Sequence, residues 1–165
     1  MSLSCGNIFF FMNNAVVSIN LRNVLPMDHG YAVFLGNDEK TFVIFVDEPV
    51  GLAITMSMRG IVKDRPLTHD LIGHMMKAFG AKVERMIINA MEGGVYYARL
   101  ILSSENEVQQ RKVVELDARP SDSIAIALAH NAPIFVAREV WENVDDVGET
   151  LEDLQKQKRK SSEAE

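Results

Sequence analysis

The sequence has almost no cysteine and no long hydrophobic segment. Cys5 is the single cysteine among 165 residues, so the chain can form no internal disulfide, and no cluster of Cys and His has zinc-finger spacing. The apolar run at 8–12 is far shorter than the roughly 20 residues that a membrane-spanning helix needs. We therefore expect a soluble, cytoplasmic protein with no membrane partner.

An excess of positive charge is also missing. The chain has 17 Lys and Arg against 23 Asp and Glu, which gives a formal net charge of −6. Tight non-specific binding to duplex nucleic acid draws most of its affinity from counterions released at Lys and Arg contacts. An acidic surface excludes that mode of binding. Any contact with nucleic acid has to be local, through a few arginines gathered at one cleft.

What is present indicates one compact domain. Apolar residues make up 47% of the chain, enough for an ordinary core at this length. Residues 1–13 lie outside the periodic pattern, and we expect a flexible N-terminus there. Residues 14–145 form the domain, and 146–165 form a charged C-terminal tail that is either a frayed helix or disordered.

Within the domain, runs of β-branched and aromatic residues predict strands, and apolar residues at helical spacing predict helices. Turn residues at 26–30 and 36–39 make the first three strands an antiparallel meander. The predicted strands are 15–25, 31–35, 41–46, 82–91, 95–103, 111–118 and 133–136. The predicted helices are 48–62, 68–79, one that begins at the Ser121 cap, and a last turn or two at 139–144.

Two short phrases of the sequence are nearly the same. Arg-Pro-Leu-Thr-His-Asp stands at 65–70 and Arg-Pro-Ser-Asp at 119–122, each just before a helical pattern. Thr68 and Ser121 are predicted N-caps of these helices. Because a helix N-terminus already carries roughly +0.5 charge, an arginine is poorly placed there unless an anion lies between the two.

The anion could be a phosphate group. Arg65 and Arg119 would offer planar forks for bidentate contacts, and the free N–H groups that follow Thr68 and Ser121 would add further donors. If the two phrases converge in the fold, these four residues form a phosphate-binding site.

Hydrolysis of a phosphodiester needs, in addition, a group that activates water. His69 is suited to proton transfer, and Asp70, Asp117 and Asp122 can accept a proton or hold a divalent cation such as magnesium through oxygen ligands. Glu48, at the end of the third predicted strand, is a further candidate metal ligand.

A purely structural interpretation explains the same residues. Asp70 and Asp122 are favourable at helix N-termini without any ligand. Arg65 and Arg119 could then pair reciprocally with Asp122 and Asp70 and tie the two helix ends together. On this interpretation the anions are the protein's own carboxylates.

Several motifs together carry a family resemblance. They are Arg-Pro-Leu-Thr-His-Asp-Leu at 65–71, Gly80, Tyr-Tyr-Ala at 96–98, Asp-Ala-Arg-Pro-Ser-Asp-Ser at 117–123 and Pro-Ile-Phe-Val at 133–136. In this order and at this separation, they resemble the bifunctional nuclease domain family over residues 14–145.

The resemblance implies a single α+β domain with a mixed, largely antiparallel sheet packed against several helices, and a homodimer. It also implies hydrolysis of RNA, DNA or both, with single-stranded nucleic acid or a nucleotide as partner. Glu48 matches a carboxylate that the family has after the third strand, although Val46-Asp47 stands here where the family often has Ile-Gly. The other matching positions are Arg65, Thr68, His69, Asp70, Asp117, Arg119, Ser121 and Asp122.

Two kinds of function therefore remain. The first is a nuclease, in which the arginines hold phosphate and the carboxylates activate water. The second is a non-catalytic module that binds an anion, a nucleotide or a protein partner through the same helix ends, and the acidic composition favours it.

Overall fold

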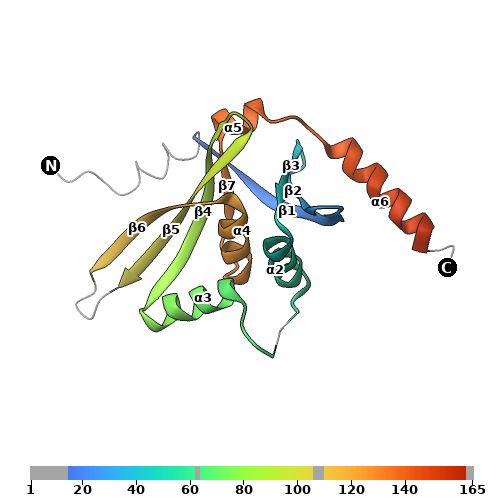
Figure 1. Ribbon diagram of the computed structural model, residues 1–165. Coiled ribbons are helices and arrows are strands. Elements are labelled where there is room, and N and C mark those ends of the chain that lie inside the picture. Colours follow the sequence, from blue (N-terminus) through green and yellow to red (C-terminus); the bar gives the residue numbers. More distant parts are fainter. Residues whose placement is uncertain (1–14, 62–63, 106–109, 163–165) are drawn as a thin grey trace.

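The computed structural model describes residues 15–61, 64–105 and 110–162 (Figure 1). Three predicted features lie wholly or partly outside these residues: the N-terminal segment 1–13, the end of the first predicted helix at Val62, and the connection between the predicted strands 95–103 and 111–118. The described strands are β1 (Val16–Met27), β2 (Gly30–Gly36), β3 (Thr41–Val46), β4 (Ala81–Glu92), β5 (Val95–Glu105), β6 (Arg111–Ala118) and β7 (Ile134–Ala137). The described helices are α2 (Glu48–Arg59), α3 (Thr68–Ala78), α4 (Pro120–Ala129), α5 (Arg138–Asn143) and α6 (Gly148–Ser162).

The strands form one sheet of seven in the order β3-β2-β1-β7-β4-β5-β6. Each neighbouring pair is antiparallel except β4 and β7, which run parallel. The predicted α+β domain with a mixed, largely antiparallel sheet is confirmed. Among the described strands, β3 and β6 are the two edges of this sheet.

The main core lies between the sheet and the helices α2 and α4, which stand side by side in front of it (Figure 1). In α4 the run 124–127 is almost completely buried, as its apolar composition predicts. Helix α3 packs against α4 and β4. The first turn of α4 therefore lies close to both α2 and α3, and this arrangement positions the site described below.

Gly51 explains how α2 approaches the sheet. A glycine inside a helix weakens the helix prediction, yet α2 runs through it without a break. A Cβ atom at position 51 would lie 2.3 Å from Cδ2 of Tyr31 on β2. The glycine thus lets the helix rest directly on the tyrosine ring. At the other end, Gly60 adopts a left-handed conformation with φ 63° and terminates α2.

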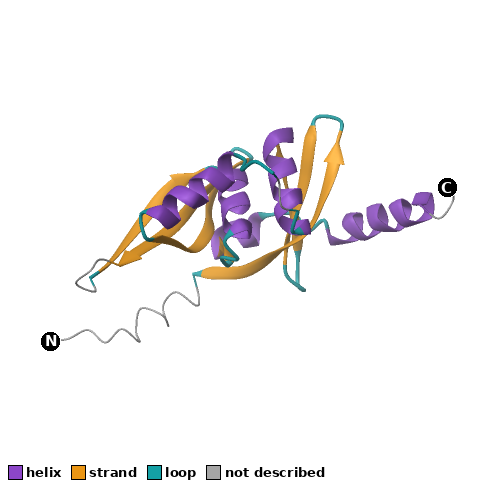
Figure 2. Cartoon of the chain, turned by 90° about the horizontal axis from the view of Figure 1, so that it is seen from below, coloured by secondary structure: helices purple, strands orange, loops and turns teal. Residues whose placement is uncertain are grey.

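One segment differs from the expectation, and at another the structure decides between two predicted alternatives. The sequence 26–30 predicts a turn, but β1 continues through Pro26 and Met27, and the reversal is confined to the two residues before Gly30, whose φ is 108°. The charged segment after 146 forms helix α6, which extends away from the other helices (Figure 2). Its Leu151 is 6% exposed and packs on Ala32 and Phe34, on the face of β2 opposite the main core.

Candidate functional site

Both Arg-Pro phrases do open helices, but the predicted caps are wrong. The N-cap residues are Leu67 and Arg119, so Thr68 and Ser121 already lie inside the first turn. In α4 the reason is Pro120, which occupies the first helical position, where a missing N–H group costs nothing. The extended backbone of Arg119, with φ −64° and ψ 142°, directs the chain into that turn.

In α3 the capping function belongs to Asp70. The backbone N–H of Leu67 donates a hydrogen bond to Oδ2 of Asp70 over 2.8 Å. The carboxylate thus satisfies a backbone donor at the helix start, which is the structural role that the sequence left open for it. Asp70 takes part in none of the hydrogen bonds of the cluster described next.

The two phrases meet through a different residue pair. Nε2 of His69 on α3 lies 3.0 Å from Oδ1 of Asp122 on α4. This contact is partly shielded from water, because the His69 side chain is only 14% exposed and the Asp122 side chain 31%. Convergence of the two phrases, on which the candidate site depends, is therefore observed.

Arg119 completes this arrangement. Its Nε donates to Oδ2 of Asp122 over 2.9 Å, and its Nη1 lies 3.4 Å from Oδ2 of Asp47. The predicted reciprocal pairing of arginines and aspartates is wrong, because Arg119 reaches the aspartate of its own helical turn, three residues away. We refer to Asp47, His69, Arg119 and Asp122 as the His-Asp-Arg cluster.

Asp47 was not among the predicted site residues. It precedes α2 at the N-cap position, yet its side chain makes no capping hydrogen bond and contacts Arg119 instead. An aspartate between a strand end and a helix start is a recognisable pattern, but it ordinarily indicates a cap. Glu48, the predicted ligand one residue later, is exposed in the first turn of α2 and lies outside the cluster.

The charges of the cluster favour the ionised form of Asp122. Partial burial alone would raise the pKa of this carboxyl, but hydrogen bonds from Arg119 and His69 outweigh that effect and hold the pKa below its ordinary value. The pKa of Arg119 shifts the opposite way. The hydrogen bond with Asp122 and the negative charge of Asp122 both raise it. Both groups are therefore charged throughout the neutral range.

This charge state fixes the tautomer of His69. An ionised carboxylate can only accept hydrogen bonds, so the proton between the two side chains belongs to Nε2 of His69. The other ring nitrogen, Nδ1, then carries the lone pair in the neutral imidazole. The Asp122 carboxylate thus orients the imidazole ring of His69 through this hydrogen bond.

The remaining predicted residues lie apart from the cluster. Arg65 is exposed on the segment that leads to α3 and forms no ion pair with a described residue. Asp117 is exposed on β6, opposite Arg99 in the sheet register. Thr68 is exposed at the start of α3, whereas Ser121 lines a cavity beside the cluster.

That cavity has a volume of about 380 Å³ and opens beside Arg119. Its walls are the last residues of β3, the turn between β4 and β5, and the first turn of α4. Phe45, Asp47, Tyr96, Arg119 and Ser121 are among its lining residues. Arg119 thus lines a space of the size that binds small ligands.

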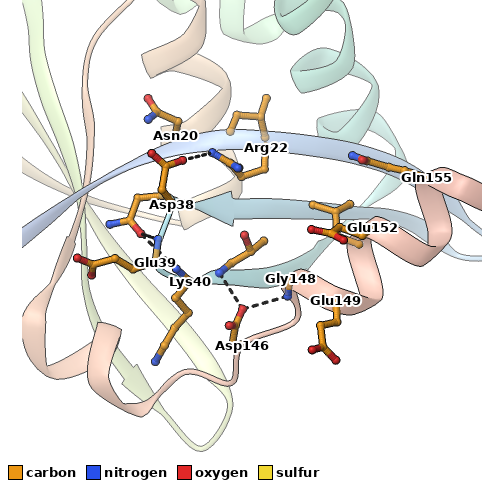
Figure 3. Close-up of a pocket in the computed structure, with 14 residues that line it drawn as sticks. Asn20, Arg22, Asp38, Glu39, Lys40, Asp146, Gly148, Glu149, Glu152 and Gln155 are labelled. Atoms are coloured by element: carbon orange, nitrogen blue, oxygen red, sulfur yellow. Dashed lines mark hydrogen bonds and ion pairs between the residues drawn. The ribbon is translucent and has the colours of Figure 1, made fainter.

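A larger cleft of about 590 Å³ lies between the β2–β3 turn and α6 (Figure 3). Its charged lining residues are Arg22, Asp38, Glu39, Lys40, Asp146, Glu149 and Glu152. Oδ1 of Asp146 accepts hydrogen bonds from the N–H groups of Thr41 and Gly148, as the dashed lines in Figure 3 show. This surplus of carboxylates repels a phosphate. The cavity beside the His-Asp-Arg cluster is therefore the better candidate for a phosphate-binding site.

The described residues do not make a ready metal centre. No group of three or more Asp, Glu, His or Cys side chains within them lies close enough together to hold a cation. Two carboxylates, those of Asp47 and Asp122, both pair with the guanidinium of Arg119. The positive charge that a cation would supply there is thus already supplied by the arginine. We therefore derive no step through a metal ion.

Fold and site together define an α+β domain with a histidine–carboxylate pair beside an arginine and an open cavity. The chain belongs to the bifunctional nuclease domain family, whose model matches residues 33–147. The motifs that carried the resemblance, including both helix openings, lie within the matched segment. None of the helices in the described ranges is long and apolar enough to cross a membrane.

The relatives include uncharacterised proteins and proteins with a named activity. An uncharacterised protein of Mycobacterium tuberculosis is 34% identical over 104 residues, which cover 63% of this chain and 58% of the relative. Bifunctional nuclease 1 of rice, Oryza sativa subsp. japonica, is 30% identical over 120 residues, which cover 73% of this chain and 34% of the relative. The matched segments thus span less than two thirds of each relative's length.

Proposed function

We propose that this protein hydrolyses phosphodiester bonds in RNA, DNA or both, with the His69–Asp122 pair as its acid–base centre. The observation that carries the proposal is the 3.0 Å contact between these two side chains, next to an exposed arginine. Membership of the bifunctional nuclease domain family and the similarity to the rice nuclease support it.

In this proposal Arg119 binds the phosphate. Its side chain is 63% exposed, and its contact with Asp47 is long at 3.4 Å and equally open to water. A phosphate oxygen can replace that contact, while the shorter bond from Nε to Asp122 keeps the guanidinium in place. Ser121, which lines the same cavity, offers its hydroxyl as an additional donor.

His69 then moves the proton. Nδ1 takes a proton from a water molecule as its oxygen attacks phosphorus, and Asp122 stabilises the imidazolium that forms. When the phosphorus–oxygen bond to the leaving group breaks, the imidazolium returns a proton to the departing oxygen. Arg119 offsets the charge that develops on the phosphate oxygens. Asp70, Asp117, Glu48, Arg65 and Thr68 have no role in this scheme, and the divalent cation expected from the sequence stays a prediction.

Purified protein incubated with end-labelled single-stranded RNA and DNA tests the proposal, with and without a chelator. We expect cleavage by the wild type, strong loss in Asp122→Asn and unchanged cleavage in His74→Gln, which replaces an exposed histidine one turn further along α3. If Asp122→Asn and the wild type gave the same trace of product, the activity would be contamination and the proposal would be wrong. The chelator arm decides the metal requirement separately.

The second candidate function is a non-catalytic module that binds a nucleotide through the same helix ends. The net charge of −6 favours it, because an acidic chain is poorly suited to broad contacts with a nucleic-acid backbone. A module that only binds a nucleotide would raise its melting temperature with that ligand, because the ligand binds the folded state alone. A nucleotide-dependent shift without cleavage of any substrate would favour this alternative.

We also propose that the protein is a homodimer, as the family resemblance implies. Helix α3 and its C-cap Phe79 carry apolar side chains that are mostly uncovered, because Leu71 and Met75 are each 53% exposed and Phe79 is 80% exposed. Only Gly73 and Met76 of this helix are buried within the chain. A stripe of this kind on a helix is typical of a protein–protein interface, and a second copy is the partner we propose for it.

A further inference from the structure

Phe45 is an aromatic residue at an unusual place in this fold. Along β3 the side chains of Phe42, Ile44 and Val46 belong to the main core, and Phe45 belongs to the opposite face. It is 71% exposed, although its immediate neighbours in sequence, Ile44 and Val46, are buried. Burial of a phenylalanine is worth about 2 kcal/mol, so an uncovered ring on an edge strand calls for an explanation outside the packing of the chain.

The position of Phe45 relative to Arg119 supplies that explanation. Both residues line the cavity of about 380 Å³ beside the His-Asp-Arg cluster, Phe45 from β3 and Arg119 from the start of α4. Because β3 is an edge strand, the cavity extends past both of its faces, with Val43 and Phe45 from one face and Ile44 and Val46 from the other among its lining residues. Val95, which is 57% exposed, adds a second apolar wall from the first position of β5. One cavity thus combines an aromatic surface with an exposed guanidinium.

This combination matches the chemistry of a nucleotide whose base is unpaired. Proteins hold single-stranded nucleic acid by stacking its bases on aromatic side chains and binding its phosphates with cations. Within a duplex the bases are already stacked on each other, and they are not available to a ring on a protein surface. The cavity volume suits a single ligand unit, and the net charge of −6 disfavours the broad phosphate contacts of duplex binding.

We propose that Phe45 stacks on an unpaired base of the substrate and thereby restricts the site to single-stranded nucleic acid. This inference rests on the proposed function for the placement of phosphate at Arg119. Phe45 is a specificity-determining residue in this arrangement, because it contacts the base next to the phosphate that is cleaved. It takes no part in proton transfer.

The test measures binding, so that it does not depend on cleavage. Fluorescence anisotropy of a labelled single-stranded oligonucleotide, with phosphorothioate linkages that resist hydrolysis, gives Kd for each variant, and the same sequence as a duplex gives the comparison. We expect Phe45→Ala to raise Kd for the single strand about 5- to 150-fold, the range for loss of one stacked base. Phe45→Trp should keep or lower Kd.

Val113→Ala is the matched control, since Val113 is an exposed apolar residue on the other edge strand, β6. Its Kd should equal that of the wild type, and melting curves should show that all variants are folded. The inference is overturned if Phe45→Ala binds the single strand as tightly as the wild type, if the duplex binds as tightly as the single strand, or if the wild type binds neither.

The inference and the proposed function fail in different ways. Binding that depends on Phe45, without cleavage of an unmodified single strand, would support the stacking site and contradict the nuclease. Cleavage that depends on His69 but binding that is indifferent to Phe45 would support the nuclease and contradict the stacking site.

Discussion

His69 and Asp122 lie 53 positions apart in the sequence, and their side chains meet at 3.0 Å between the first turns of α3 and α4. Each residue belongs to one of the two Arg-Pro phrases. The contact shows that the repetition in the sequence has a spatial counterpart, because the fold places the two helix starts next to each other. Arg119 donates a hydrogen bond to the second oxygen of the Asp122 carboxylate and lowers its pKa.

Replacement of His69 should affect catalysis more than folding. We expect His69→Gln to lower kcat by about 10² to 10⁴, the usual contribution of a positioned acid–base group, because glutamine cannot accept the proton. His74→Gln on the same helix is the control and should keep full activity. Initial rates on a single-stranded oligonucleotide measure the effect. Equal rates for both variants would remove His69 from the mechanism.

The His-Asp-Arg cluster should make stability depend on pH. The folded-state pKa of Asp122 lies below the value of about 3.9 expected in the unfolded chain, so its contribution is fully present above that value and is lost as pH falls through the folded-state pKa. We expect Asp122→Asn to cost about 1 kcal/mol at pH 7, a modest value because the site is partly open to solvent.

Urea unfolding of both proteins between pH 7 and pH 2 measures this difference, which should shrink below about pH 4. Asp153→Asn, at an exposed position of α6, is the control and should show almost no difference at any pH. A gap between wild type and Asp122→Asn that stayed constant down to pH 2 would contradict the assigned ionisation.

Arg119→Lys should separate phosphate binding from proton transfer. Lysine keeps the charge but cannot donate to Asp122 and a phosphate through one rigid fork. We expect Kd for a single-stranded oligonucleotide to rise about tenfold, which corresponds to the loss of one charged hydrogen bond. Arg99→Lys, at an exposed ion pair with Glu115 on β5 and β6, should leave Kd unchanged. Similar losses in both variants would indicate a non-specific charge effect.

A side chain at Gly73 should weaken the packing of α3 on α4. A Cβ atom there would lie 2.6 Å from Nε2 of His130, so Gly73→Ala should cost about 1 kcal/mol although alanine is the better helix former. In a His130→Ala background the same change should stabilise the protein by about 1 kcal/mol. Thermal unfolding of the four proteins measures this coupling, and additive effects would show that His130 does not set the helix spacing.

The exposed stripe of α3 should control the oligomeric state. A charge in the middle of an apolar interface is not compensated, so we expect Met75→Lys to convert a dimer into a monomer. Light scattering coupled to size-exclusion chromatography measures the mass directly. Leu154→Lys, at an exposed apolar position of α6, should leave the mass unchanged. A monomeric wild type would contradict the proposed dimer.

Local patterns predicted most of the elements. β3 and β6 have the predicted bounds 41–46 and 111–118, because alternation and the flanking turn residues mark both ends of each strand. The N-caps of α3 and α4 lie one and two residues before the predicted Thr68 and Ser121. In α4 Pro120 takes the first helical position, and in α3 the Asp70 carboxylate accepts the hydrogen bond from the N-cap backbone. Cap choice depends on local geometry that residue type alone does not decide.

The candidate site was predictable only in part. His69, Arg119 and Asp122 stand in repeated motifs, so the sequence marks them as candidates. It does not separate them from Asp70, Asp117 and Arg65, which have the same chemistry and lie outside the cluster. The sequence does not mark Asp47 as a site residue, because an aspartate before a helix normally serves as a cap, whereas here its side chain contacts Arg119.

The sequence by itself determined the class of fold, the family and the two helix openings, because periodicity, turn residues and capping chemistry act over a few neighbouring positions. Only the tertiary structure decided which carboxylates share Arg119, which ring nitrogen of His69 carries the proton and which apolar residues remain uncovered. These properties depend on distances between segments that are 50 or more residues apart, such as the 53 between His69 and Asp122. Packing of α2, α3 and α4 on the sheet sets those distances.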